Sequence, residues 1–192
     1  MDLGAQENKK TIFLVCGMSG AGKDSLVKTA CDELGLTQVK SYTTRPRRQG
    51  EKDTHIFIDE KDFNTCATEG KGIVAFTKIG EYIYFATQQQ LHDADFYVID
   101  PNGIETMKTI IGNYSDFRFV TIYINTPRNV REQHAINKRN DDALTFYKRC
   151  FNEEIQFQEM LSRGDFDYAV SNVNFDTAYS VFKAIVEAEL EC

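Results

Sequence analysis

The chain has 192 residues, enough for one domain with a sizeable core, and its apolar fraction of 42% is ordinary for a globular protein. Its formal net charge of −7, from 22 basic and 29 acidic residues, disfavours a protein that coats nucleic acid, because such a protein needs a broad basic face. No apolar stretch approaches the ~20 residues of a membrane helix, and the polar start MDLGAQENKK lacks the apolar region of a signal peptide. We therefore expect a cytoplasmic protein with neither a membrane nor a nucleic acid as partner.

The cysteines and histidines show no metal-binding pattern. The five cysteines are scattered and form neither a CxxC nor a CxH spacing, and the three histidines show no zinc-binding spacing. We expect reduced thiols, with Cys16 packed as a small apolar residue in a strand.

Apolar runs alternate with amphipathic stretches along the chain. We expect strands at 11–16, 94–100, 117–125 and 168–172 and helices at 23–34, 104–111, 128–139, 143–161 and 175–190. This alternation predicts an α/β fold, a parallel sheet flanked by helices. Residues 41–90 break the rhythm with turns and short alternating strands. We expect a single domain, 1–192, with a core of 1–40, 91–130 and 150–192, an inserted subdomain at 41–90 and a mobile helical segment at 131–149.

The segment GMSGAGK, residues 17–23, follows the first predicted strand, opens the first predicted helix and fits the pattern G-x-x-x-x-G-K. Glycines let successive backbone N–H groups point at phosphate oxygens, and the positive end of the helix dipole adds to the attraction. Lys23 supplies a mobile positive charge for the β- and γ-phosphates. The residues expected to hold ATP are those of this loop and the helix start: Gly17, Ser19, Gly20, Ala21, Gly22, Lys23, Asp24 and Ser25.

Asp24 stands where this pattern usually has a serine or threonine whose hydroxyl binds Mg²⁺. A carboxylate is a hard oxygen ligand, so Asp24 is a candidate ligand for the metal. The alternative is an acidic residue in the first helical turn, which stabilises the helix by about 0.3–1 kcal/mol.

A basic cluster on this acidic chain, TTRPRRQGEK at 43–52, indicates a local anionic ligand, although a solvated basic loop would have the same composition. The stretch SYTTRPRRQGE (41–51), followed by HIFIDEKDF (55–63), resembles the guanylate kinase family, whose phosphate-binding stretch reads S-x-T-T-R-x-x-R-x-G-E. The resemblance continues through YFAT, VIDPNG and VSNVNFDTA and so spans nearly the whole chain. It implies a P-loop NTPase fold with an inserted acceptor-binding subdomain and a helical lid.

The resemblance implies an acceptor site. Ser41, Arg45 and Arg48 would grip the acceptor's monophosphate, and both arginines could reach one phosphate because they are three residues apart. Glu51 would orient those arginines. Thr87, or Tyr84 as the alternative, would match a further acceptor contact of the family.

Metal, lid and adenine contacts are implied as well. Asp100, at the carboxyl end of its strand, would reach the acceptor or the metal. The family's other strand acid aligns with Val98, which leaves Asp24 and Asp100 to hold Mg²⁺. The implied lid arginines are Arg139 and Arg149, and the residue near adenine is Asn172. The residues implied to be catalytic are Lys23, Arg45, Arg139 and Arg149.

The chain departs from the family at the acceptor site. His55 replaces an aromatic hydroxyl that contacts the acceptor phosphate, and a histidine can also donate to phosphate. The glutamate that reads guanine aligns with Val74, or else Glu81 takes its place in a shifted hairpin. One arginine of the lid pair aligns with Ala135, although Arg131 lies one turn earlier.

We expect an enzyme, a monomer or homodimer, that transfers phosphoryl from ATP, with Mg²⁺, to a nucleoside monophosphate, foremost GMP or dGMP. One alternative is a kinase of other base specificity. Another is a ribose 1,5-bisphosphate phosphokinase, which GKDSL and His55-Ile56 resemble, although TTRPRRQGE and VIDPNG favour guanylate kinase. The third is a non-catalytic guanylate-kinase-like binding module. Those modules typically lose the P-loop lysine, whereas Lys23 is present.

Overall fold

A central parallel sheet organises the chain. The computed structural model describes residues 9–47, 54–111, 116–138 and 142–191, so the predicted site residues Arg48, Glu51 and Arg139 lie outside the described residues. The sheet has the strand order β6-β1-β7-β8, and its neighbouring strands run parallel, as the sequence predicts. The strands are β1 (Lys10–Cys16), β6 (Phe96–Val98), β7 (Phe117–Asn125) and β8 (Tyr168–Ser171).

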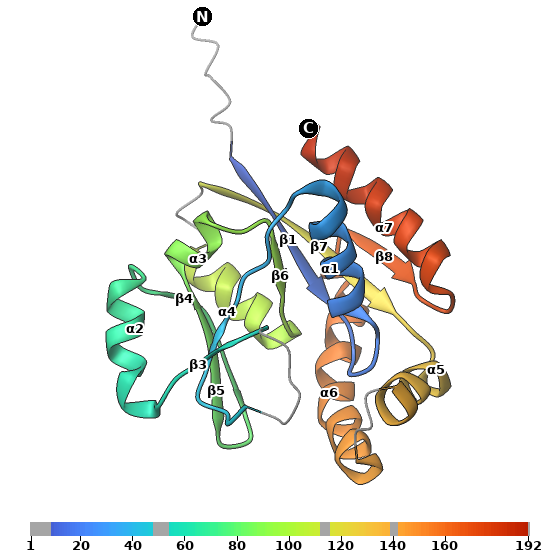
Figure 1. The fold of residues 1–192 in the computed structure, drawn as a ribbon, viewed down its shortest axis with the longest axis horizontal. Helices are drawn as coiled ribbons and strands as arrows, with labels where there is room; N and C mark the ends of the chain where they lie inside the picture. The colour runs from blue at the N-terminus through green and yellow to red at the C-terminus, as the bar shows by residue number, and fades with distance from the viewer. Residues whose placement is uncertain (1–8, 48–53, 112–115, 139–141, 192) are drawn as a thin grey trace, which may run out of the picture.

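Alternate side chains of β1 enter two different cores, because successive residues of a strand point to opposite faces. Ile12, Leu14 and Cys16 pack with residues of α4 (Pro101–Ile111) and α6 (Ala143–Arg163). Phe13 and Val15 pack with residues of α1 (Lys23–Leu34) and α7 (Phe175–Leu190). Helices thus cover both faces of the sheet, and the start of β1 and the end of α7 lie at the same end of the molecule (Figure 1).

The helix ends follow the capping signals in the sequence. Helix α1 has the predicted bounds and ends at Gly35, whose φ of 68° is the left-handed conformation that glycine adopts easily. Asp142 accepts a hydrogen bond from the N–H of Thr145 at the start of α6. Helix α4 begins at Pro101, three residues before the prediction, because Pro suits a first turn and Asp100 accepts the N–H of Gly103 at 3.0 Å.

A second, small sheet lies beside the central one and packs on α4 (Figure 1). Its order is β3-β2-β5-β4, and the long β4–β5 hairpin turns at Gly80, whose φ is 63°. Val74 and Ala75 of this hairpin share a core cluster with Met107 of α4. Its elements are β2 (Tyr42–Thr43), β3 (Ile56–Phe57), η1 (Glu60–Asp62), α2 (Phe63–Glu69), β4 (Ile73–Ile79), β5 (Tyr82–Thr87) and α3 (Gln88–His92).

The helical stretch predicted at 128–139 is helical in its described residues, 128–138, but it is not one continuous α-helix. The described residues there make a short α-helix, α5 (Arg128–Glu132), which passes into a π-helix, η2 (Gln133–Lys138). The wider turn accompanies the burial of Ala135 against Phe146 and Cys150 of α6, packing that a sequence period cannot reveal. Among the residues that the structure describes, no helix combines the length and apolar character that crossing a membrane requires.

Candidate active site

The loop between β1 and α1 requires glycine at two positions. Gly20 and Gly22 have φ angles of 81° and 89°, in the left-handed region that other residues rarely adopt. A Cβ atom at Gly20 would lie 2.5 Å from the carbonyl oxygen of Arg131, and one at Gly22 would lie 2.4 Å from Nδ2 of Asn172. The loop therefore sits directly against the segments that follow β7 and β8.

The residues directly after β7 and β8 hold the loop through one of its carbonyl groups. The oxygen of Ala21 accepts hydrogen bonds from Oγ1 of Thr126, at 2.9 Å, and from Nδ2 of Asn172, at 2.7 Å. Both donors are buried, Asn172 to 2% exposure. Asn172 also lines a cavity of about 540 Å³ with the loop, His134 and Phe175, so the predicted adenine contact lies at the loop and supports it.

A buried arginine of α5, Arg131, also supports the loop. The residue is 6% exposed, and its guanidinium donates to the carbonyl oxygens of Thr126, at 3.1 Å, and Ser19, at 3.3 Å. It also donates to Sγ of Cys150 at 3.2 Å. Sequence reasoning noticed Arg131 as a displaced lid arginine. Its support of the loop depends on a contact across 112 residues.

The polar groups of the loop bind other groups of the chain. Nζ of Lys23 donates to the carbonyl oxygen of Gly17 at 2.6 Å and to that of Met18 at 3.4 Å. The N–H and the hydroxyl of Ser19 donate to the carboxylate of Glu153 on α6, at 2.7 and 2.5 Å. Glu153 was not predicted as a site residue, because a single glutamate in a helix of mixed charge carries no signal.

Cys16 ends β1 directly before the loop and is fully buried. Burial raises the pKa of its thiol to about 12, and the thiol lies 3.8 Å from Sδ of Met160. The prediction that Cys16 packs as a small apolar residue in a strand is confirmed.

A cavity of about 420 Å³ brings the loop and the small sheet together. It lies between the carboxyl ends of the central strands and the β4–β5 hairpin, where ligands bind in open α/β sheets. The predicted site residues that line it are Gly17, Ser19, Lys23, Asp24, Ser41, His55, Tyr84, Asp100 and Arg149. Gly20, Ala21, Gly22 and Ser25 line the neighbouring cavity on the other side of the loop.

On the small-sheet side, Oγ of Ser41 lies 2.9 Å from Nδ1 of His55, and the His55 ring packs edge-on against Tyr84 at 5.7 Å between centroids. Arg45 is 8% exposed and does not line the cavity itself. Its Nε donates to the hydroxyl of Tyr84 at 2.9 Å, and its guanidinium stacks over Phe57 at 5.4 Å. Arg45 therefore reaches the cavity through Tyr84.

Thr87 has a structural role in this conformation. It is 1% exposed, does not line the cavity and forms a capping box with Gln90 at the start of α3. Of the two residues considered for one acceptor contact, the structure brings Tyr84 to the cavity.

The two predicted metal ligands, Asp24 and Asp100, both line the cavity that contains Lys23. One carboxylate oxygen of Asp100 accepts the N–H of Gly103, which fixes the side chain. In the described ranges, no group of three or more acidic, histidine or cysteine side chains could hold a metal alone. Two carboxylates suit Mg²⁺, which keeps several waters and binds phosphate oxygens.

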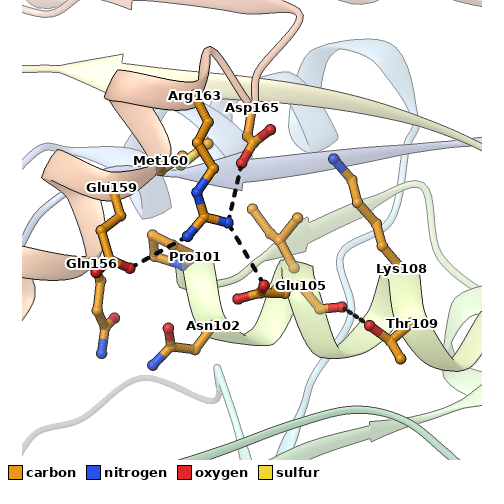
Figure 2. A pocket seen from close by; sticks show the side chains of 11 residues that line it. Pro101, Asn102, Glu105, Lys108, Thr109, Gln156, Glu159, Met160, Arg163 and Asp165 are labelled. Atoms are coloured by element: carbon orange, nitrogen blue, oxygen red, sulfur yellow. Dashed lines mark hydrogen bonds and ion pairs between the residues drawn. The ribbon is translucent and has the colours of Figure 1, made fainter.

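A separate cavity of about 300 Å³ lies between α4 and α6, and none of the predicted site residues lines it. Figure 2 shows Arg163 at its centre, pointing toward Glu105, Glu159 and Asp165, with nitrogen–oxygen distances of 3.7, 3.5 and 3.9 Å. Of these ion pairs, the one with Glu105 attaches the end of α6 to α4.

The glycine-lysine loop, the parallel sheet and the cavity between the loop and the small sheet define a P-loop α/β protein. A family model described as guanylate kinase matches residues 8–189. The chain therefore belongs to the guanylate kinase family and is a nucleoside monophosphate kinase.

Individual relatives agree with this membership. The chain is 30% identical over 189 residues to a guanylate kinase of Bdellovibrio bacteriovorus, covering 93% of this chain and 97% of that protein. It is 28% identical over 192 residues to one of Legionella pneumophila (strain Paris), covering 95% and 88%. The crystal structure of guanylate kinase from Anaplasma phagocytophilum, 18% identical, matches 94% of this chain and 87% of that one with a TM-score of 0.62, which supports the fold.

Proposed function

We propose that the protein transfers the γ-phosphoryl group of ATP to the phosphate of GMP or dGMP. The observation that carries this proposal is the shared cavity, with Lys23 and Asp24 at the loop and Ser41, His55 and Tyr84 across from them. The loop would bind the donor's phosphates, and the small sheet would bind the acceptor's phosphate. Arg48 and Glu51, outside the described residues, would complete the acceptor side.

The acceptor phosphate is ionised at neutral pH, so the reaction needs no general base. The difficulty is to bring two polyanions together, and positioning and charge neutralisation carry nearly all of the catalysis. Lys23 would bind the β- and γ-phosphates, and Arg149, which lines the same cavity, would contact the transferring group together with Arg139. Mg²⁺, held by Asp24 and Asp100, would neutralise charge on the donor's phosphates.

The β4 side of the cavity favours a second candidate acceptor, a nucleoside monophosphate with another base. Thr77, Lys78 and Ile79 of β4 line it, whereas Val74 is buried in the core and Glu81 lies exposed at the hairpin turn. Within the described residues, therefore, neither position considered for the guanine-reading glutamate places a carboxylate in the cavity. Without a buried acceptor for a base N–H group, the site discriminates less strongly between nucleotide bases.

An assay coupled to ADP formation tests the proposal with a panel of GMP, dGMP, AMP, CMP, UMP and ribose 1,5-bisphosphate. We expect the highest kcat/KM with GMP or dGMP, and no activity in the Lys23→Ala variant. Highest activity with another nucleoside monophosphate would select the second candidate. Turnover of ribose 1,5-bisphosphate alone, or of none of the panel, would contradict both.

A further inference from the structure

A carboxylate of the chain itself occupies the loop. The two oxygens of Glu153 accept the N–H and the hydroxyl of Ser19, at 2.7 and 2.5 Å. In a glycine-lysine loop, such donors are the groups that receive phosphate oxygens. Glu153 therefore lies where the loop would hold an anion of a ligand.

The lysine of the loop also has partners within the chain. Nζ of Lys23 donates to the carbonyl oxygens of Gly17 and Met18, which belong to the loop. A phosphate oxygen and the Glu153 carboxylate cannot both accept the single N–H of Ser19, and two negative groups this close repel each other. A bound triphosphate and the present position of Glu153 exclude one another.

The two halves of α6 are attached differently. The C-terminal half enters the main core through Phe157 and Met160, and Arg163 binds Glu105 of α4, as Figure 2 shows. The N-terminal half buries Phe146 and Cys150 with Ala135 of η2, in a small cluster separate from the main core. The large apolar side chains that this half leaves exposed are Leu144, Tyr147 and Phe151, with Phe151 71% exposed. Few buried contacts make a segment easy to displace, so the N-terminal half is the part that a ligand would move.

Arg149 lies one helical turn before Glu153 and lines the cavity that contains Lys23 and Ser19. Residues four apart lie on the same face of a helix. A movement of α6 that takes Glu153 away from the loop would therefore also move Arg149 relative to the cavity.

We propose that Glu153 is an internal competitor of the phosphoryl donor. In the empty protein it fills an anion position of the loop; donor phosphates displace it, and the displacement repositions the start of α6 and Arg149. This inference rests on the proposed function only in taking the loop as the site of the donor's phosphates. It does not depend on which acceptor is used.

The test is calorimetric titration of the full chain with two probes, inorganic tripolyphosphate and ATP, without acceptor. Glu153→Gln removes the charge at nearly constant shape, and Glu153→Ala removes the contact. The matched control is Glu154→Gln, an exposed neighbour that changes the net charge equally. Because a hydrogen bond to a charged group is worth a tenfold effect or more, we expect both Glu153 variants to bind tripolyphosphate and ATP about tenfold or more tightly than wild type. Glu154→Gln should bind as wild type does.

Unchanged or weaker binding in both Glu153 variants would overturn the proposal, and so would an equal gain in Glu154→Gln. Absence of binding in wild type and variants alike would also overturn it. A second readout is the amide proton resonance of Ser19: Glu153→Gln should shift it in the empty protein but not in the ATP complex. An unshifted resonance in the empty protein would refute the contact. Failure of the proposed function looks different, because it is loss of acceptor turnover by wild type, whatever the titrations give.

Discussion

Arg45 reaches the phenol oxygen of Tyr84, to which its Nε donates at 2.9 Å, and so connects a buried guanidinium to the cavity beside Ser41 and His55. This link between β5 and the chain after β2 gives the acceptor side of the site a fixed geometry. It also leaves a planar, always charged group next to the position proposed for the acceptor phosphate.

Tyr84→Phe should therefore weaken acceptor binding and leave donor binding intact. The variant loses one hydrogen-bond partner of Arg45 and a hydroxyl of the cavity, each worth about 0.5–1.5 kcal/mol, so KM for GMP should rise about fivefold or more. Steady-state kinetics with GMP and titration with ATP measure the two effects. Tyr82→Phe, on the same strand but outside the cavity lining, is the control. Equal losses for both nucleotides would contradict the placement of Tyr84 on the acceptor side.

Gly20→Ala should disable the loop, because the new Cβ would lie 2.5 Å from the backbone oxygen of Arg131, which cannot move aside easily. We expect ATP affinity to fall about tenfold or more. Gly35→Ala is the matched control: its φ of 68° is also left-handed, but nothing lies within 4 Å of the added Cβ. That control should lose about 1–2 kcal/mol of stability and keep its ATP affinity. ATP titration and urea unfolding of both variants measure these effects. Similar ATP affinities in the two variants would contradict the requirement for glycine at position 20.

Asn172→Ala should destabilise the protein and loosen the loop together. It leaves the buried carbonyl of Ala21 with Thr126 alone, a loss of about 1–3 kcal/mol in unfolding free energy. Urea unfolding measures this loss, with Asn129→Ala on the exposed face of α5 as control. A variant as stable as wild type would mean that the amide contributes nothing to holding the loop.

Glu189 gives the fold a pH dependence. Hydrogen bonds from Tyr168 and Arg118 lower the pKa of its carboxyl below the ordinary value of 4.5. A lowered pKa in the folded state means that the contribution to stability is complete above the unfolded pKa of about 4.5 and is lost as pH falls through the folded value. Since Arg118 is partly exposed, solvent screening limits the contribution to about 0.5–1 kcal/mol.

Glu189→Gln should accordingly lower the unfolding free energy at pH 7, and its difference from wild type should shrink below about pH 4. Urea unfolding at several pH values measures this, with the exposed Glu191→Gln as control. A difference that stays constant from pH 7 to pH 3 would contradict the assignment.

Much of the fold could be predicted from local signals in the sequence. Gly22 and Gly35 delimit α1, and the apolar runs of β1 and β7 predict a parallel sheet because each precedes a helical stretch. The π-helix that follows α5 was not predictable, since it depends on the packing of Ala135 against α6.

The candidate site was predictable where one segment contains it, as in the loop with Lys23, or where family motifs mark it, as at Ser41 and His55. Thr126 and Glu153 were missed because their contacts with the loop join residues more than 100 positions apart. Such pairs leave no spacing in the sequence, and only the topology of the sheet brings them together.

Binding of a two-headed inhibitor, adenosine and guanosine joined through five phosphates, tests most directly the claim that donor and acceptor meet in the cavity between Lys23 and Ser41. We predict a one-to-one complex about 100-fold or more tighter than that of ATP or GMP alone, because the second head binds at high effective concentration. An affinity no greater than that of ATP would contradict a shared cavity.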